Sequence, residues 1–237
     1  MRLGIMQPYF FPYLGYFQLM LAVDRWIAFD IVKYNRKSWM NRNRVLHPEH
    51  GWQYVSVPVR AAEGEPISTA KMLDAPAAMR RILGQLGHYR GKAPYFGQVC
   101  GLVEAAFATV ASDGIADLDM RSLVVVCEYL DIPLDWSSCS AMGLDLPAIE
   151  HAGQWALEIC SALGATRYVN PPGGRGLFRP REWSARGIEL RFLNPARMVY
   201  ATDPYSYVED LSVLDVLMWN GGAAVADHLR STLSVID

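Results

Sequence analysis

The sequence predicts an α/β fold, in which a mixed sheet is combined with a largely helical segment at about residues 75–165. Short apolar runs typical of strands alternate with helical patterns, and helical spacing of apolar residues dominates the middle of the chain. Hydrophobic residues make up 51% of the 237 residues and charged residues 19%, which allows a sizeable core and excludes a disordered protein. Because no linker composition is visible, we expect residues 1–237 to form a single domain with a helical insertion.

The first sixty residues predict three strands and one helix. Leu3–Met6 is a short apolar run that suits a buried strand, and the apolar pattern after Gly15 predicts a helix that ends near Asp24. Residues 25–32 are rich in aromatic and β-branched residues, which is typical of a second strand. Residues 52–59 alternate and predict a third, with a proline that favours a sheet edge or a strand end.

The middle of the chain predicts helices, and the remainder mixes both kinds of element. Helical spacing marks residues 77–88, 95–111, 118–130 and 146–164, and the last of these has Gly164 in the C-cap position. Short extended segments are expected near Trp136 and at 166–169 and 188–193, followed by a helix at 211–219. Ser212 would cap that helix, with Asp215 in a variant of the capping box.

Charge and terminal composition exclude several classes of protein. The formal charge of −2 gives no global field to attract nucleic acid or an anionic membrane. No stretch approaches the ~18 consecutive apolar residues of a membrane helix. The apolar run at the amino terminus is too short for the apolar region of a signal peptide. The four cysteines form no CxxC pair, so we expect no metal site, reduced thiols and a cytoplasmic location.

Aromatic residues concentrate in one short segment. Six of the nine residues from Tyr9 to Phe17 are aromatic, although prolines and a glycine interrupt the segment. Lying between a strand and a helix, it would form a rigid wall for a polar ring, with Gln7, Tyr9 and Tyr13 facing a ligand. We expect Phe11 and Phe17 to join the core. The alternative is a helix entry in which all the rings simply pack.

The segment from Asp30 to Asn43 is the second candidate. Asp30 lies near the end of a predicted strand, where a carboxylate is either a site base or a solvated strand end. Five basic residues make the region cationic, which favours the ionised form of Asp30: Lys33, Arg36, Lys37, Arg42 and Arg44. Trp39 offers a stacking plane beside the donors of Asn41, Arg42 and Asn43. A charged surface hairpin is the plain alternative, and a nucleic-acid patch is disfavoured by the overall charge.

Other motifs carry weaker signals. The loop Asn170–Gly174 follows a strand and would let a ligand approach the backbone, but it lacks GK[ST] and completes no GxGxxG, so a nucleotide enzyme is disfavoured. Asn220 follows a predicted helix and could reach a site. Cys139 is the more accessible thiol, whereas Cys160 lies in an apolar helical context typical of core thiols. No HExxH or GxSxG arrangement supports a zinc hydrolase or an esterase.

Taken together, several motifs resemble the WbqC-like family. They begin with Gln7-Pro-Tyr-Phe-Phe-Pro-Tyr-Leu-Gly-Tyr-Phe17, Asp30 and Ser38-Trp-Met-Asn-Arg-Asn43, and weaker matches continue to Asn220-Gly221. The resemblance implies transfer of an acyl or aminoacyl group to the amine of a sugar in polysaccharide or antibiotic pathways. The chain is also similar to the amide-forming condensing enzymes of lincosamide pathways, which join a carrier-bound prolyl-type amino acid to an amino-octose. Lys33, Asn170–Gly174 and Phe178 depart from the family pattern where acceptor contacts are expected.

The expectation is therefore an amide-forming transferase that condenses a carrier-bound thioester with an amino sugar. Asp30 would act as the base, Gln7 and Asn43 as oxyanion donors, and Arg42 would orient the substrate. Tyr9, Tyr13 and Trp39 would form the pocket, and the further binding residues are Lys33, Asn41, Asn170 and Asn220. A covalent route through Cys139 or Cys160 is the mechanistic alternative. The partners would be a carrier protein, whose phosphopantetheine arm is the co-substrate, and the sugar, with no tightly bound cofactor. The functional alternative is a non-catalytic sugar-binding or scaffold protein of such a pathway.

Overall fold

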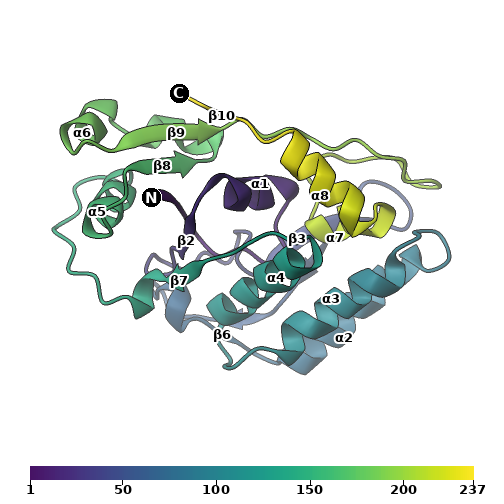
Figure 1. Ribbon diagram of the computed structural model, residues 1–237. Helices are drawn as coiled ribbons and strands as arrows, with labels where there is room; N and C mark the ends of the chain where they lie inside the picture. Colours follow the sequence, from purple (N-terminus) through teal and green to yellow (C-terminus); the bar gives the residue numbers. More distant parts are fainter.

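A six-stranded sheet organises the fold of the computed structural model, which describes residues 1–237 (Figure 1). The strand order is β10-β9-β8-β1-β2-β7. Five strands run parallel: β1 (Arg2–Met6), β2 (Arg25–Ala28), β7 (Trp136–Ser138), β8 (Arg167–Asn170) and β9 (Glu189–Leu193). The edge strand β10 (Val235–Ile236) is antiparallel to β9. The predicted α/β fold with a mixed sheet is confirmed.

Alternation along the strands divides the hydrophobic core between the two faces of the sheet. Leu3, Ile5 and Ile27 belong to a cluster of 12 buried residues that includes side chains of α5 (Gln154–Ala162) and α6 (Pro180–Ala185). Trp26 and Ala28 point to the other face and join a cluster of 48 buried residues. Helices therefore cover both faces of the sheet.

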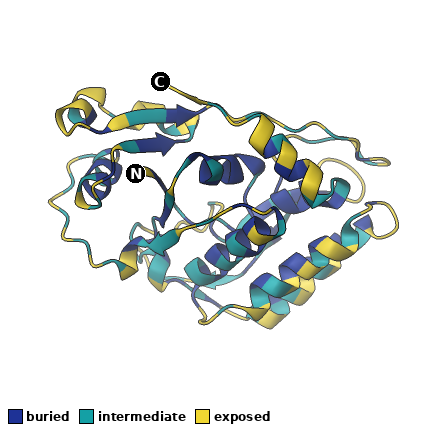
Figure 2. Cartoon of the chain, in the orientation of Figure 1, coloured by how far each residue is buried: buried dark blue, intermediate teal, exposed yellow.

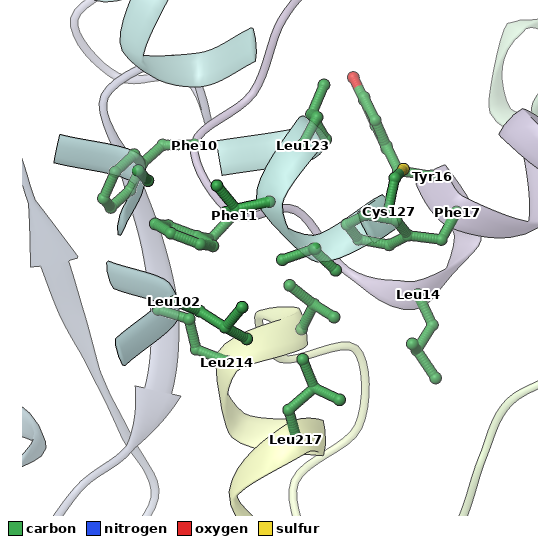
Figure 3. Packing of buried hydrophobic residues seen from close by; sticks show 14 of the residues in the cluster. Phe10, Phe11, Leu14, Tyr16, Phe17, Leu102, Leu123, Cys127, Leu214 and Leu217 are labelled. Carbon is green, nitrogen blue, oxygen red and sulfur yellow. The ribbon is translucent and has the colours of Figure 1, made fainter. Parts of the chain in front are cut away.

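Six helices contribute side chains to the larger cluster. These are α1 (Leu14–Ala22), α2 (Ala75–Leu86), α3 (Phe96–Ala108), α4 (Ile115–Tyr129), α7 (Val213–Trp219) and α8 (Gly222–Ser231). Figure 2 shows α1 almost wholly buried at the centre, whereas α2 and α3 expose their outer faces. Figure 3 shows Phe10, Phe11 and Phe17 inside this cluster with Leu123 of α4 and Leu214 of α7. The segment after β1 thus packs where α4 and α7 meet.

Two small antiparallel sheets complete the chain. Strand β3 (Arg42–Leu46) pairs with β4 (Trp52–Ser56), and β5 (Val59–Arg60) pairs with β6 (Lys71–Met72). Four 3-10 turns connect the main elements: η1 (Ile67–Thr69), η2 (Gly87–Tyr89), η3 (Cys139–Ala141) and η4 (Pro172–Leu177).

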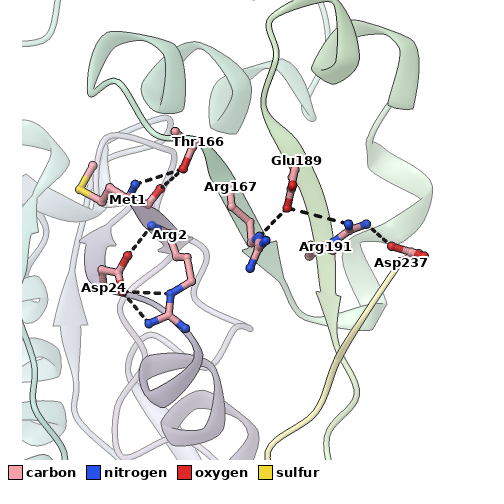
Figure 4. Close-up of polar contacts among 8 residues, drawn as sticks. All are labelled: Met1, Arg2, Asp24, Thr166, Arg167, Glu189, Arg191 and Asp237. Atoms are coloured by element: carbon pink, nitrogen blue, oxygen red, sulfur yellow. Dashed lines mark hydrogen bonds and ion pairs between the residues drawn. The ribbon is translucent and has the colours of Figure 1, made fainter.

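The strand order reverses direction between β1 and β8. From β1 the chain moves outward through β2 to β7, and then returns to the other side of β1 for β8 and β9. In open α/β sheets ligands bind at the carboxyl ends of the strands near such a reversal. At the opposite, amino-terminal ends, polar contacts join neighbouring segments, among them Arg2 with Asp24 and Arg167 with Glu189 (Figure 4). The loops after β1, β2, β7 and β8 are therefore the ones positioned for function.

Several boundaries differ from the sequence-based expectation. The extended segment expected near Trp136 is β7, and it joins the main sheet, so the helical segment predicted at 75–165 is divided after α4 ends at Tyr129. The helix expected from residue 146 begins only at Gln154. The second strand ends at Ala28 rather than at residue 32, and β3 and α8 were not predicted.

The start of α7 confirms one predicted cap and corrects another. The Ser212 hydroxyl accepts a hydrogen bond from the Leu214 N–H at 3.2 Å, as expected for an N-cap. The predicted capping-box role of Asp215 is wrong. Its carboxylate instead accepts hydrogen bonds from Tyr89, Tyr200 and the Leu46 N–H. The cause is burial, because Asp215 faces the core rather than the first turn of its own helix.

Candidate functional site

The aromatic loop after β1 is held rigidly by three distant side chains. The Asn43 amide donates to the carbonyl oxygens of Phe10 and Phe11, at 3.1 and 3.0 Å. The Ser212 hydroxyl donates to the Phe11 carbonyl at 2.7 Å, and the Phe11 N–H donates to the Ser122 hydroxyl at 3.1 Å. Phe11 has a left-handed backbone (φ 38°), which a phenylalanine adopts only when its surroundings enforce it. The loop is therefore a preorganised wall.

The rings of this loop divide between core and pocket. Phe10, Phe11 and Phe17 are completely buried, and Tyr16 is buried with its hydroxyl donating to the Gln7 carbonyl at 3.0 Å. Tyr9 and Tyr13 are partly exposed. The structure thus places Phe11 and Phe17 in the core and gives Tyr9 and Tyr13 to a pocket, the same division that the sequence suggested.

The first pocket, here called the ring pocket, has a volume of about 680 Å³. Five aromatic side chains line it: Tyr9, Tyr13, Trp39, Tyr200 and Tyr207. Its polar wall includes Gln18, Asn43, Arg44, Arg197 and Asp210. The hydroxyl of Tyr200 donates to the Asp215 carboxylate at 3.0 Å, and that of Tyr207 donates to the Met198 carbonyl at 3.1 Å. These bonds fix both rings, which meet edge to face with centroids 5.2 Å apart.

The second pocket, here called the cationic pocket, has a volume of about 940 Å³. Its lining is formed by Gln7, Tyr9, residues 33–40 and residues 61–63. Lys33, Arg36 and Lys37 are exposed there and form no ion pair with a carboxylate. Glu63 is the one acidic residue in this lining. The pocket therefore favours an anionic group.

Tyr9 and Trp39 belong to both pockets, which consequently adjoin along these two rings. The Tyr9 hydroxyl donates to the Gln7 side-chain oxygen at 3.2 Å, and the backbone N–H of Phe10 donates to the Trp39 carbonyl at 3.0 Å. The Gln7 oxygen is thus occupied, whereas its amide nitrogen makes no hydrogen bond within the chain. A free N–H donor lies beside the boundary between the pockets.

Asp30 lies outside both pockets. Its side chain is only 2% exposed, and both carboxylate oxygens are occupied by Ser140 of η3. The Ser140 N–H donates to one oxygen at 2.8 Å and the Ser140 hydroxyl donates to the other. These hydrogen bonds join the carboxyl ends of β2 and β7. Proton transfer by Asp30 stays a prediction.

The other predicted donors on the hairpin are also engaged within the chain. Asn43 lines the ring pocket, but its amide hydrogen bonds hold the aromatic loop. The Asn41 amide donates to the Val57 carbonyl at 2.9 Å. The Arg42 guanidinium donates to the Lys37 carbonyl at 2.8 Å and stacks on Tyr54. Asn41 and Arg42 line neither pocket.

Two predicted binding residues lie at other places. Asn170 is 7% exposed at the end of β8, where its side-chain oxygen accepts a hydrogen bond from the Tyr168 hydroxyl at 2.7 Å. Asn220 ends α7 and donates to the Val216 carbonyl at 2.8 Å. Neither residue lines the ring pocket or the cationic pocket. The structure therefore brings together Gln7, Tyr9, Tyr13, Lys33, Trp39 and Asn43, and leaves the remaining candidates outside.

The two candidate cysteines, Cys139 and Cys160, have the environment of core thiols. Cys139 is 4% exposed, and burial with the nearby Asp30 charge raises its pKa to about 11. Cys160 is completely buried, and burial raises the pKa of its thiol further. Since the thiolate is the reactive form, neither residue has the environment of an activated nucleophile. The prediction that Cys139 is an accessible thiol is wrong, because η3 packs its side chain into the smaller cluster.

Asp119 is a buried carboxyl group that the sequence analysis did not single out. It is 0% exposed in α4, and neither of its oxygens has a hydrogen-bond partner in the chain. A negative charge on Asp119 contributes to raising the pKa of three nearby tyrosines: Tyr9, Tyr16 and Tyr34. Burial raises its pKa well above the ordinary value. The available signal was its position on the apolar side of a predicted helix, one turn before Ser122.

Replacing Asp119 with asparagine should remove a pH dependence of stability. The unfolded chain releases this proton near the usual pKa of about 3.9, whereas the folded chain retains it to higher pH because the pKa is raised. Between the two pKa values the unfolded state binds fewer protons, so the wild-type free energy of unfolding falls as pH rises. Urea unfolding from pH 4 to 8 should show Asp119→Asn gaining stability relative to wild type. A difference between the two proteins that stays constant with pH would contradict a raised pKa.

Comparison with known proteins supplies the family of the chain. The profile of the WbqC-like protein family matches residues 7–227. The chain belongs to the WbqC-like protein family. Uncharacterized protein Rv1507c of Mycobacterium tuberculosis (strain ATCC 25618 / H37Rv) is 24% identical over 231 residues, covering 97% of each chain. No solved structure matches the sequence.

The family match includes the whole aromatic motif near the amino terminus, on which the resemblance to this family was first based. In this WbqC-like protein the match begins at Gln7, the first residue of the aromatic loop, and spans both pockets. The structure contains no group of three or more His, Cys, Asp or Glu side chains arranged to hold a metal ion, and none of its helices is long and apolar enough to cross a membrane.

Sequence reasoning missed most of the ring pocket. Gln18, Tyr200, Tyr207 and Asp210 were not proposed as site residues, although they line it. The segment that carries the two tyrosines has no helical or strand periodicity. Its dense tyrosines, Tyr200, Tyr205 and Tyr207, were the only signal, and nothing local links them to residues 9–13.

Proposed function

We propose that this protein is an amide-forming transferase that condenses an acyl or aminoacyl thioester, borne by a carrier protein, with the amine of an amino sugar. The observation that supports it is the pair of adjoining pockets that share Tyr9 and Trp39. A transfer between two substrates requires two binding spaces that meet where the reacting atoms must approach. The biosynthetic setting, polysaccharide or antibiotic, follows from the resemblance of the motifs to that family.

The chemical character of each pocket supports an assignment of substrates. Aromatic rings with polar groups around them, as in the ring pocket, suit the faces and hydroxyls of a sugar. In the ring pocket the Arg197 guanidinium donates a hydrogen bond to the Asp210 carboxylate at 2.8 Å. An ammonium group of a bound sugar would therefore share this carboxylate with Arg197. The unpaired Lys33, Arg36 and Lys37 of the cationic pocket suit the phosphate of a phosphopantetheine arm.

The chemistry requires a neutral amine and donors for the oxyanion of the tetrahedral intermediate. The amine nitrogen attacks the thioester carbonyl, a C–N bond forms, the C–S bond breaks, and the amine proton ends on the departing thiolate. The free Gln7 N–H at the boundary of the pockets is positioned to stabilise developing negative charge on the carbonyl oxygen. Direct aminolysis agrees with the buried, high-pKa cysteines better than a covalent route does.

Reconstitution tests the proposal directly. The protein is mixed with a carrier protein loaded with a panel of aminoacyl thioesters and with a panel of amino sugars, and amide products are detected by mass spectrometry. We expect an enzyme-dependent amide product and no persistent mass increase on the protein when the thioester is added alone. Binding of amino sugars without any product across both panels would instead support the alternative, a non-catalytic sugar-binding protein.

Asp30→Asn tests the predicted base. If Asp30 accepts the amine proton, this variant should lose turnover by about 10²–10⁴-fold, the usual contribution of a general base. The matched variant Ser140→Ala removes one donor to Asp30 without removing the carboxylate, and it should lose far less turnover. Full turnover by a folded Asp30→Asn protein would assign Asp30 to joining β2 and β7 and not to proton transfer.

A further inference from the structure

The outer face of the β3–β4 hairpin combines arginines with aromatic rings. Strand alternation places Arg42, Arg44, Trp52 and Tyr54 on one side of the hairpin, whereas Asn43, Val45 and Val55 are buried on the other. Trp39 lies just before β3 and contacts this side through Arg44 and Tyr54. We call these five residues, Trp39, Arg42, Arg44, Trp52 and Tyr54, the arginine–aromatic face.

The two arginines are held in fixed orientations. The Arg42 guanidinium lies 4.3 Å from the centre of the Tyr54 ring, and that of Arg44 lies 5.4 and 5.2 Å from Trp39 and Trp52. Each also donates to a backbone carbonyl, Arg42 to Lys37 at 2.8 Å and Arg44 to Asp210 at 3.1 Å. Guanidinium groups stacked in this way are preorganised for oxyanions.

None of these cations is neutralised by a carboxylate of the chain. Elsewhere basic residues pair with acids, as Arg2 does with Asp24, Arg167 with Glu189 and Arg197 with Asp210. Around the arginine–aromatic face the arginines instead donate to carbonyl groups, including Arg36 to Ala61 and Arg81 of α2 to Ser56. Residues 31–48 contain five basic residues and no acidic one, in a chain whose formal charge is −2. The positive charge is therefore local and uncompensated.

The face is continuous with both pockets through shared residues. Trp39 lines the ring pocket and the cationic pocket, and Arg44 lines the ring pocket. Trp39 and Trp52 are 36% and 41% exposed, so the face presents large rings beside the charges. Exposed rings and arginines are the residues that dominate protein interfaces.

We propose that the arginine–aromatic face docks an acidic surface of a partner protein, which in the reaction proposed above is the carrier protein. The inference rests on that proposed function for the partner's identity. Complementary charge would steer the carrier to the face, and the shared Trp39 places the docked protein beside the entrance to the cationic pocket. A nucleic-acid strand is disfavoured, because such ligands need a continuous cationic groove and this positive stretch ends at Glu49 and Glu63.

Binding to the full-length protein tests the surface without requiring turnover. An acidic acyl carrier protein in its apo form is titrated against wild type, Arg42→Glu and Trp52→Ala, with Arg181→Glu as a control on α6. Arg181 is exposed and forms no ion pair, so Arg181→Glu makes the same change of charge as Arg42→Glu at a position outside the arginine–aromatic face. We expect about tenfold weaker binding for Arg42→Glu and Trp52→Ala, unchanged binding for Arg181→Glu, and an affinity that falls with added salt.

A second measurement separates this inference from the proposed function. With a small pantetheine thioester in place of the loaded carrier, Trp52→Ala should keep wild-type turnover, because Trp52 lines neither pocket, while its KM for the loaded carrier rises. Carrier binding without any turnover would overturn the proposed function and retain the surface. If Arg42→Glu and Trp52→Ala both turn over the loaded carrier as wild type does, the docking surface is overturned and the proposed function is retained. Equal or tighter binding of a single-stranded oligonucleotide, lost in the same variants, would also overturn it.

Discussion

Asp215→Ala should lower the free energy of unfolding by about 3–5 kcal/mol, because it leaves the buried hydroxyls of Tyr89 and Tyr200 without an acceptor. The Asp215 side chain is 0% exposed and accepts hydrogen bonds from three groups. The Leu46 N–H and the Tyr200 hydroxyl donate at 3.0 Å each, and the Tyr89 hydroxyl also donates. Burial raises the Asp215 pKa, and these three donors partly oppose that shift. Urea denaturation followed by circular dichroism measures the loss.

The same substitution should disturb the ring pocket, since Asp215 holds Tyr200 in its wall. Asp215→Asn is the matched control, because it retains the shape and one acceptor oxygen while removing the charge. We expect Asp215→Asn to lose clearly less stability than Asp215→Ala. A loss below about 1 kcal/mol for Asp215→Ala would mean that water replaces the carboxylate, and would contradict the assigned role.

Asn43→Ala should cost about 2–4 kcal/mol and should also disorganise both pockets. Asn43 is 4% exposed and its amide holds the carbonyls of Phe10 and Phe11, while its oxygen accepts from the Arg44 N–H at 2.9 Å. Without it, the left-handed backbone of Phe11 loses two of the bonds that enforce it. Tyr9 would then no longer be held at the boundary of the pockets.

The neighbouring Asn41 provides the control for this prediction. Asn41→Ala removes one hydrogen bond, to the Val57 carbonyl, on the same hairpin and outside the pockets. We expect a loss of about 1 kcal/mol and an unchanged near-ultraviolet circular dichroism spectrum for this variant. Asn43→Ala should alter the near-ultraviolet signal, which reports the packing of the tyrosines. Equal losses for the two variants with equal spectra would show that Asn43 does not preorganise the loop.

Much of the fold was predictable because its signals are local. Apolar residues at helical spacing placed α2, α3 and α4 to within a few residues, and the first strand and the Ser212 cap were also correct. The elements that were missed depend on distant partners. Strand β3 carries charge on the side away from the core and is held by its pairing with β4. Helix α8 begins at the second of two glycines, Gly221 and Gly222, which resemble the end of a helix.

The candidate site shows the same division. The density of rings from Tyr9 to Phe17 pointed to a pocket wall, and the structure puts Tyr9 and Tyr13 there. Asp30 looked like a base because it follows a strand in a cationic segment. The structure adds that its carboxylate accepts hydrogen bonds from Ser140, which is 110 residues away and close in space only because β2 and β7 are adjacent strands.

By itself, the sequence of this WbqC-like protein determined its class of fold, the helices in the middle of the chain and the division of the rings after β1 between core and pocket. Tertiary structure alone decided which polar groups remain free. Periodicity and capping act within a few residues, whereas the bonds that hold Phe11 come from Ser122 and Ser212, 111 and 201 residues away. Hydrogen bonds between such distant groups engage the Asp30 carboxylate and the Asn43 amide within the chain, whereas Gln7, Tyr9 and Trp39 lie at the boundary of the two pockets.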